Sequence, residues 1–152
     1  MSIALALHVL AVVIWVGGMF FAYMALRPIA ASQLDAPMRL SLWSGVFGKF
    51  FPWVIASIVL ILISGYWMIF GPYGGMKNTP VFVHIMQLLG LIMMAIFGHL
   101  FFAPYKRLKQ AVASQDWSNA GTQLSQIRLM IGINLSLGLI TTVIGAAGKY
   151  WT

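Results

Sequence analysis

Four uninterrupted apolar segments dominate this sequence and limit what the chain can fold into. They cover residues 3–26, 50–70, 81–103 and about 129–147, and no Asp, Glu, Lys or Arg lies inside any of them. A helix needs about 20 apolar residues to cross a bilayer. Only 7% of the residues are charged, against roughly a quarter in soluble domains. The sequence therefore predicts an all-α membrane protein, an antiparallel four-helix transmembrane bundle.

One transmembrane domain is expected over residues 1–152, with helices at about 3–26, 38–70, 81–110 and 117–148. The first helix is expected to end at Leu26-Arg27-Pro28, because proline interrupts the helical hydrogen bonds. The third helix is expected to continue beyond the bilayer through the basic segment 106–109. The first segment lacks a basic n-region and exceeds a typical h-region, so it is not expected to be a cleaved signal peptide.

The positions of the basic residues predict the orientation of the bundle. Seven of the nine lie in the first and third loops, and two lie in the second loop and at the C-terminus. The positive-inside rule then places both termini outside, in a bacterial inner membrane that the chain crosses several times. The cations sit at helix ends without interleaved aromatic residues. This pattern indicates the lipid bilayer as partner and no nucleic acid.

Composition excludes several kinds of chemistry. The chain has no cysteine, so disulfides, thiolate metal sites, Cys-ligated iron–sulfur clusters and c-type haem attachment are impossible. It has two Asp, both in expected loops, and no Glu. Carboxylate-driven hydrolysis or proton pumping is therefore not expected.

The three histidines are the main candidates for chemistry, because an ionisable residue inside a membrane is costly and marks a functional site by default. His8 and His84 lie on different helices at a matching expected depth, roughly 6–8 Å below the outer interface at about 1.5 Å per residue. His99 lies roughly 22 Å deeper than His84 along the same helix. This arrangement favours haem b with His8 and His84 as axial iron ligands. His99 would then be a second-site ligand or an inner-side proton or quinone contact.

Other readings of the histidines stay open. Each could simply hydrogen-bond a hydroxyl or backbone group across a helix interface. Copper is a further alternative, because His with Met suits Cu(I) and Met76, Met86, Met93 and Met94 flank or share the third helix.

Four further residues are candidate haem contacts. Trp15 falls seven residues after His8 on one face of the first helix, and Gly18 would let a macrocycle or a neighbouring helix approach the backbone. Lys149 could pair with a propionate at the outer site and Arg128 at the inner one. Both cations also fit ordinary topology and snorkelling anchors.

The residues resemble those of a known membrane family. The segment 8–20 (HVLAVVIWVGGMF) is similar to the first helix of the CopD-like, copper resistance D, family. Further similar stretches are 50–53 (FFPW), 65–67 (GYW), 83–87 (VHIMQ) and 99–104 (HLFFAP). The resemblance covers nearly the whole chain. It implies copper handling, usually from the outer side inward.

A second, weaker resemblance is to HemJ-type protoporphyrinogen oxidases, which are also short four-helix chains. The first helix, with Trp15 seven residues after His8, and the His pair of the third helix carry it. The chain lacks the aromatic, Pro and Arg run of that family after the first helix, and Met86 stands where a basic residue is expected. The resemblance therefore implies haem b binding rather than protoporphyrinogen oxidation.

Together these features predict a cytochrome b-like, haem b-binding membrane protein that transfers one electron to or from a quinone or membrane redox partner. An oxidoreductase activity and a homo-oligomer both remain open. Copper uptake or resistance of the CopD type is the first alternative. A structural accessory subunit of a membrane complex is the second.

Overall fold

The computed structural model describes residues 1–151, which form helices joined by short turns, with no strand among them. In chain order the helices are α1 (Ser2–Phe21), the π-helical turn η1 (Ala22–Leu26), α2 (Arg27–Gln33), α3 (Ala36–Phe70), the 3₁₀ turn η2 (Met76–Asn78), α4 (Val81–Phe102), α5 (Pro104–Ala113), α6 (Trp117–Ala147) and the 3₁₀ turn η3 (Gly148–Tyr150).

Four helical segments are long and apolar enough to cross a membrane: Ser2–Gln33, Ala36–Phe70, Val81–Ala113 and Trp117–Tyr150. Large apolar side chains are exposed on every one of them, including Val13, Ile63, Leu88 and Leu129, each at least 60% exposed. Water does not favour so much exposed apolar surface, whereas lipid covers it without cost. The prediction of an all-α, multi-pass membrane protein with four spanning helices is confirmed.

The first helical segment does not end at Pro28, so the expected break there is wrong. The helix continues to Gln33 through η1, where the Arg27 N–H donates to the Ala22 carbonyl five residues earlier. A π turn widens the helix just before the proline ring, which would otherwise press on the preceding turn. The segment therefore extends seven residues beyond the expected end at residue 26.

The third segment shows the opposite difference, because a break occurs where continuity was expected. α4 ends at Phe102, and Pro104 begins α5 as a separate helix. Ala103 has φ −115° and ψ −87°, outside the helical region. Proline disfavours helical geometry in the residue before it and has no N–H for the preceding turn. The basic segment 106–109 thus lies on its own short amphipathic helix.

An aspartate lies at the start of each of the helices α3 and α6. The Asp35 carboxylate accepts the Met38 N–H at 3.0 Å at the start of α3. The Asp116 carboxylate accepts the Asn119 N–H at 3.3 Å at the start of α6. Each bond satisfies one N–H that the first helical turn leaves free.

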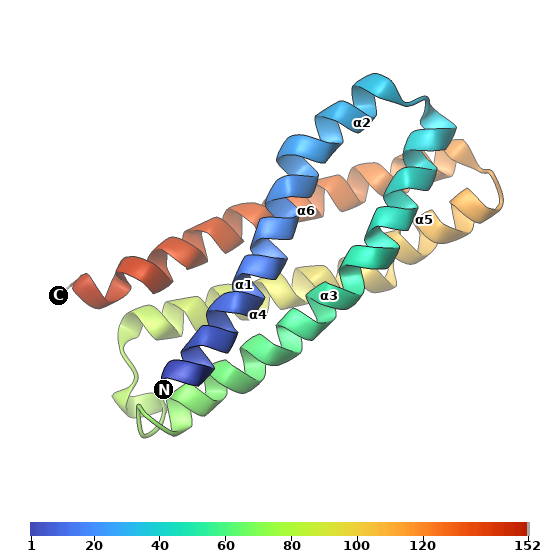
Figure 1. Ribbon diagram of the computed structural model, residues 1–152. Coiled ribbons are helices and arrows are strands. Elements are labelled where there is room, and N and C mark those ends of the chain that lie inside the picture. Colours follow the sequence, from blue (N-terminus) through green and yellow to red (C-terminus); the bar gives the residue numbers. More distant parts are fainter. Residues whose placement is uncertain (152) are drawn as a thin grey trace.

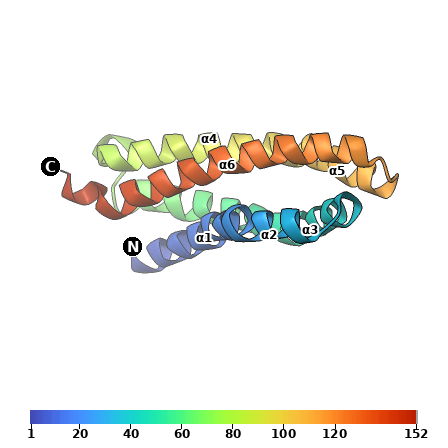
Figure 2. The ribbon, with the colours of Figure 1, turned by 90° about the horizontal axis from the view of Figure 1, so that it is seen from above.

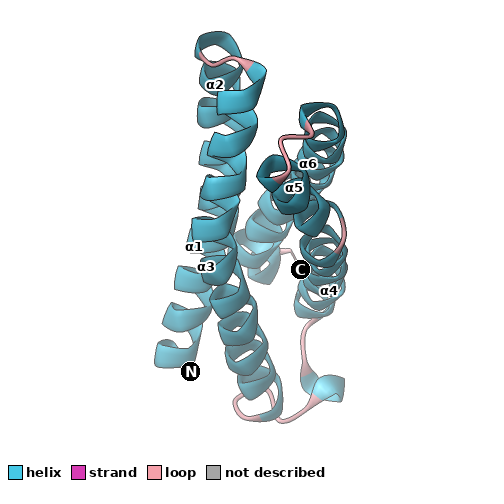
Figure 3. Cartoon of the chain, turned by 90° about the vertical axis from the view of Figure 1, so that its right-hand side faces the viewer, coloured by secondary structure: helices cyan, strands magenta, loops and turns pink. Residues whose placement is uncertain are grey.

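The helices form two layers. α1, α2 and α3 make one layer, and α4, α5 and α6 make the other (Figure 2). Figure 3 shows the same separation from the side. Residues early in α1 contact residues late in α3: His8 bonds Ser64, whereas Gly18 meets Phe50. The two helices therefore run in opposite directions.

Both chain ends lie at one end of the bundle, together with the loop from residue 71 to residue 80 (Figure 1). We call this the termini end. The turns between α2 and α3 and between α5 and α6 lie at the opposite end, which we call the turn end. The positive-inside rule predicts that the termini end faces outward.

An aromatic cluster joins the layers in the half of the bundle nearer the turn end. The rings of Phe47 and Phe51 stack with centroids 4.9 Å apart. Phe51 meets Phe97 of α4 and Tyr105 of α5 edge-on, at 5.3 and 4.8 Å. Such ring pairs are favourable beyond the area they bury. This cluster fixes α3 against the other layer.

Candidate functional site

His8 is held by a hydrogen bond across the interface between α1 and α3. It is partly buried, and its Nδ1 lies 3.0 Å from the Oγ of Ser64, which is 4% exposed. The Ser64 hydroxyl has one hydrogen, and its 2.6 Å separation from the Leu60 carbonyl assigns that hydrogen to the carbonyl. His8 Nδ1 must then donate to Ser64. Its Nε2 therefore keeps a lone pair that can bind a metal.

His84 lies in the first turns of α4 and is partly buried. Its Nε2 lies 3.1 Å from the backbone carbonyl of Met76 in the preceding loop. A carbonyl can only accept a hydrogen bond, so Nε2 carries the proton and Nδ1 keeps the lone pair. His8 thus makes a hydrogen bond across a helix interface, whereas His84 bonds the preceding loop, and each still offers one nitrogen as a ligand.

Both histidines belong to the termini end. His8 bonds the last third of α3, and a second polar bond joins that part of α3 to α4, where the Gln87 amide donates to the Tyr66 hydroxyl at 2.9 Å. His84 lies one turn before Gln87. The axial ligation of one haem iron by the His8 and His84 pair stays a prediction.

His99 lies in the half of α4 nearer the turn end and is exposed. It lies on the surface of the bundle rather than among the buried residues. A role for it in a second site likewise remains a prediction.

Three of the four other candidate contacts have structural partners. Trp15 is 3% exposed and packs edge-on against Phe97, with centroids 6.3 Å apart. The space over Gly18 is occupied by the Phe50 ring. Lys149 lies in η3, with its ammonium group 4.8 Å from the centroid of the Tyr150 ring. At Gly18 the small residue therefore admits a neighbouring helix, which was one of the two readings of that position.

Glycines of α6 also let neighbouring helices approach closely. A Cβ at Gly138 would lie 2.9 Å from Val16 and 3.1 Å from Met93, so α1, α4 and α6 meet at this point. A Cβ at Gly145 would lie 2.9 Å from the methyl of Met86. These glycines allow close helix packing.

Two polar features of the interior were not predicted as site residues. Ser57 and Ser64 are both buried, seven residues apart on one face of α3. Their spacing inside an apolar segment was a signal that could have identified Ser64 as a partner for His8. Asn134 is 2% exposed; its amide donates to the Met93 carbonyl at 3.1 Å, whereas its Oδ1 has no partner within residues 1–151.

The arrangement contains ligands but no preformed carboxylate or thiolate centre. Within residues 1–151, no three His, Cys, Asp or Glu side chains lie close enough together to hold a metal ion. Imidazole nitrogen and methionine sulfur are the side-chain donors at the termini end that suit a soft metal. Soft thioether ligands of this kind select Cu(I) among common metal ions.

Comparison with known families identifies the chain. The family model described as CopD, copper resistance protein D, matches residues 44–147. The match covers more than half of the chain and includes Ser64, His84 and His99, whereas His8 precedes it. Comparisons with curated proteins and with solved structures return no match. The resemblance seen in the sequence is thus confirmed, and the chain belongs to the copper resistance protein D family.

Proposed function

We propose that this protein binds Cu(I) at the termini end of its bundle and takes part in copper uptake or resistance in a bacterial inner membrane. The observation that carries the proposal is the His8–Ser64 bond of 3.0 Å. This bond orients an imidazole inside an apolar bundle and leaves its Nε2 free. Membership of a family described by copper resistance supplies the choice of metal.

Methionines supply the sulfur ligands in this proposal. Met68 is 8% exposed and follows Ser64 by one turn on the same face of α3. Met76 is 38% exposed and carries the carbonyl that His84 binds. We assign His8 with Met68 as the inner ligands and His84 with Met76 as the entry ligands.

The types of ligand atom at the termini end favour a soft, singly charged ion. The two acidic residues, Asp35 and Asp116, lie at the turn end. Hard cations such as Mg²⁺ and Ca²⁺ prefer carboxylate and carbonyl oxygens. Neutral nitrogen and sulfur ligands therefore favour Cu(I). With the termini end facing outward, as the basic residues predict, copper would reach these ligands from outside the cell.

Haem b held by His8 and His84 is the second candidate, with electron transfer to a quinone or another membrane redox partner. The two free imidazole nitrogens at one end of the bundle support it, because bis-imidazole ligation suits electron transfer. Two of its expected contacts count against it, because Phe50 fills the position over Gly18 and Trp15 packs directly on Phe97. A purely structural subunit would bind neither copper nor haem.

Cellular copper content tests the copper proposal. We expect bacteria that produce the wild-type chain to accumulate more copper than bacteria that produce His8→Ala, because the variant lacks the inner nitrogen ligand. His99→Ala is the matched control, since it removes an exposed imidazole outside the site. Membrane levels of all three proteins are compared by immunoblot. Equal copper in wild-type and His8→Ala cells at equal protein levels would contradict the proposal.

A further inference from the structure

A cavity at the turn end gathers three arginines from three segments of the chain. Its volume is about 230 Å³, and it lies between η1, α2, α3 and α6. Arg27 lines it from the start of α2, Arg39 from the first turn of α3 and Arg128 from α6. Residues far apart in the sequence thus place three fixed positive charges around one space.

No acidic side chain among the described residues that line the cavity balances these charges. The two carboxylates of the chain are engaged at the starts of α3 and α6, where each accepts a backbone N–H. The Nε–H of Arg27 donates to the Tyr23 carbonyl at 3.2 Å, and an Nη1–H of Arg39 donates to the Leu34 carbonyl at 3.1 Å. Each guanidinium has five N–H groups, so most of their donors remain available. The cavity therefore suits an anion.

The remaining lining is apolar and aromatic. Trp43, Phe47 and Leu40 are buried beside the arginines. Exposed apolar residues follow two lining residues in the sequence: Met24, after Tyr23, is 55% exposed, and Leu129, after Arg128, is 66% exposed. An occupant with an anionic group and an apolar tail would match both parts. The cavity is smaller than the roughly 300–1,000 Å³ of typical drug-sized pockets, so it would hold a head group and leave the tail outside.

We propose that this cavity binds the phosphate of an anionic phospholipid. One guanidinium group can donate two parallel hydrogen bonds to two oxygens of a phosphate, whereas a lysine ammonium group acts as a point charge. Basic pockets between transmembrane helices on the cytoplasmic side are suited to anionic head groups. The basic residues predict that the turn end faces the cytoplasm. This inference does not depend on copper or haem binding at the termini end.

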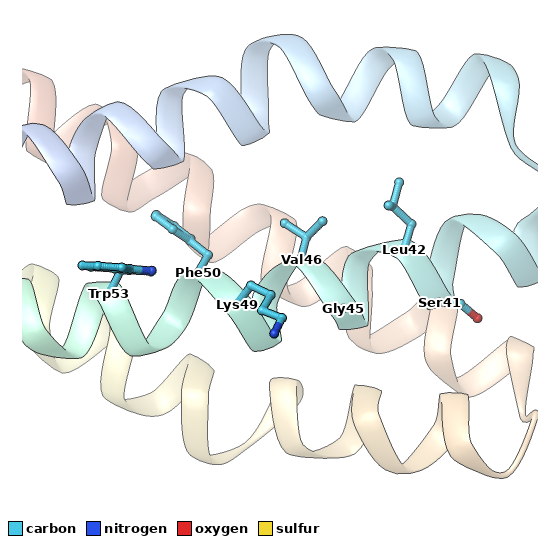
Figure 4. Close-up of a pocket in the computed structure, with 7 residues that line it drawn as sticks. All are labelled: Ser41, Leu42, Gly45, Val46, Lys49, Phe50 and Trp53. Atoms are coloured by element: carbon cyan, nitrogen blue, oxygen red, sulfur yellow. The ribbon is translucent and has the colours of Figure 1, made fainter.

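A second surface groove lacks such a gathering of cations from several segments. Ser41, Leu42, Gly45, Val46, Lys49, Phe50 and Trp53 line it, and all seven come from α3 (Figure 4). Lys49 is its single cation. One helix face with one flexible lysine cannot surround a phosphate, so we assign no ligand to this groove.

Thermal unfolding in dodecyl maltoside tests the lipid site. We expect short-chain phosphatidylglycerol to raise the Tm of the wild-type protein, and phosphatidylcholine or inorganic phosphate at the same concentration to leave it unchanged. Arg128→Gln should weaken the apparent affinity for phosphatidylglycerol about fivefold, because one cation near a lipid head group contributes roughly that factor. Arg107→Gln is the matched control, since Arg107 is exposed on α5 and does not line the cavity.

Several outcomes would overturn the assignment. An equal loss of affinity in Arg107→Gln would indicate that the lipid responds to the general surface charge and not to the cavity. An equal effect of phosphatidylcholine would show that the site does not recognise the anionic head group. An equal effect of inorganic phosphate would show a site for free phosphate rather than lipid. If Arg128→Gln unfolds without lipid, Arg128→Lys serves instead: it keeps the charge but loses the paired donors, and an affinity equal to wild type would then contradict the proposal.

Discussion

His8→Ala is expected to lower the affinity of the purified protein for Cu(I) by more than about 100-fold. Loss of a residue that only hydrogen-bonds a metal ligand costs roughly 10- to 100-fold, and loss of the ligand itself should cost more. The substitution removes the nitrogen that Ser64 orients and leaves the proposed Met68 ligand without its nitrogen partner. Competition with the chromogenic chelator bathocuproine disulfonate, in detergent under reducing conditions, measures the affinity.

Ser64→Ala separates orientation from ligation in the same titration. It keeps the His8 imidazole but removes the oxygen that accepts its Nδ1–H, so we expect a loss of about 10- to 100-fold. Ser57→Ala is the matched control, because Ser57 is also a buried serine of the same α3 face. His99→Ala controls for imidazole loss as such. Unchanged affinity in His8→Ala, or equal losses in Ser64→Ala and Ser57→Ala, would refute the ligand assignment.

Gly18→Ala is expected to destabilise the bundle by about 1–3 kcal/mol, the usual cost of overpacking. A Cβ there would lie 2.5 Å from Cζ of Phe50, and closer still to Cε1 of that ring. Gly17→Ala is the adjacent control, since a Cβ at Gly17 meets nothing within 4 Å. Alanine favours a helix over glycine by up to about 1 kcal/mol in water, so Gly17→Ala should be neutral or stabilising.

Unfolding by sodium dodecyl sulfate in mixed micelles, followed by circular dichroism, gives both free energies. The double variant Gly18→Ala with Phe50→Leu should recover part of the loss, because the smaller side chain relieves the overlap. If Gly18→Ala is as stable as Gly17→Ala, α1 and α3 do not pack through this contact.

The spanning segments could be predicted from hydropathy because the bilayer demands a minimum length of apolar helix. The effects of Pro28 and Pro104 could not be predicted in this way. Pro28 was expected to end a helix, but the π turn of η1 accommodates it. Pro104 was expected to lie within a helix, but Ala103 leaves the helical region before it. Whether a helix bends, widens or breaks at proline depends on the packing of both flanking turns, which hydropathy does not describe.

The candidate site could be predicted only in part. The histidines stand out because they are ionisable groups in apolar helices. The Ser64 partner of His8 depends on the register between α1 and α3, and the Met76 partner of His84 depends on the conformation of the loop before α4; a single sequence reveals neither. The sequence allows either a macrocycle or a neighbouring helix to approach Gly18, and only the fold shows that the Phe50 ring of α3 occupies this space.

The arginine cavity was also hidden in the sequence. The sequence shows three separate basic residues in different loops and helix ends, Arg27, Arg39 and Arg128, each typical of a topology anchor. Only the fold shows that they line one cavity.

The most direct test of the copper assignment is the metal content and visible spectrum of the protein purified from bacterial membranes grown with added copper. Elemental analysis measures copper and iron, and a pyridine haemochrome assay measures haem. We expect stoichiometric copper, no haem absorbance, and loss of the copper in His8→Ala. Stoichiometric haem iron without copper, lost in both His8→Ala and His84→Ala, would contradict the copper assignment and establish the histidine pair as haem ligands.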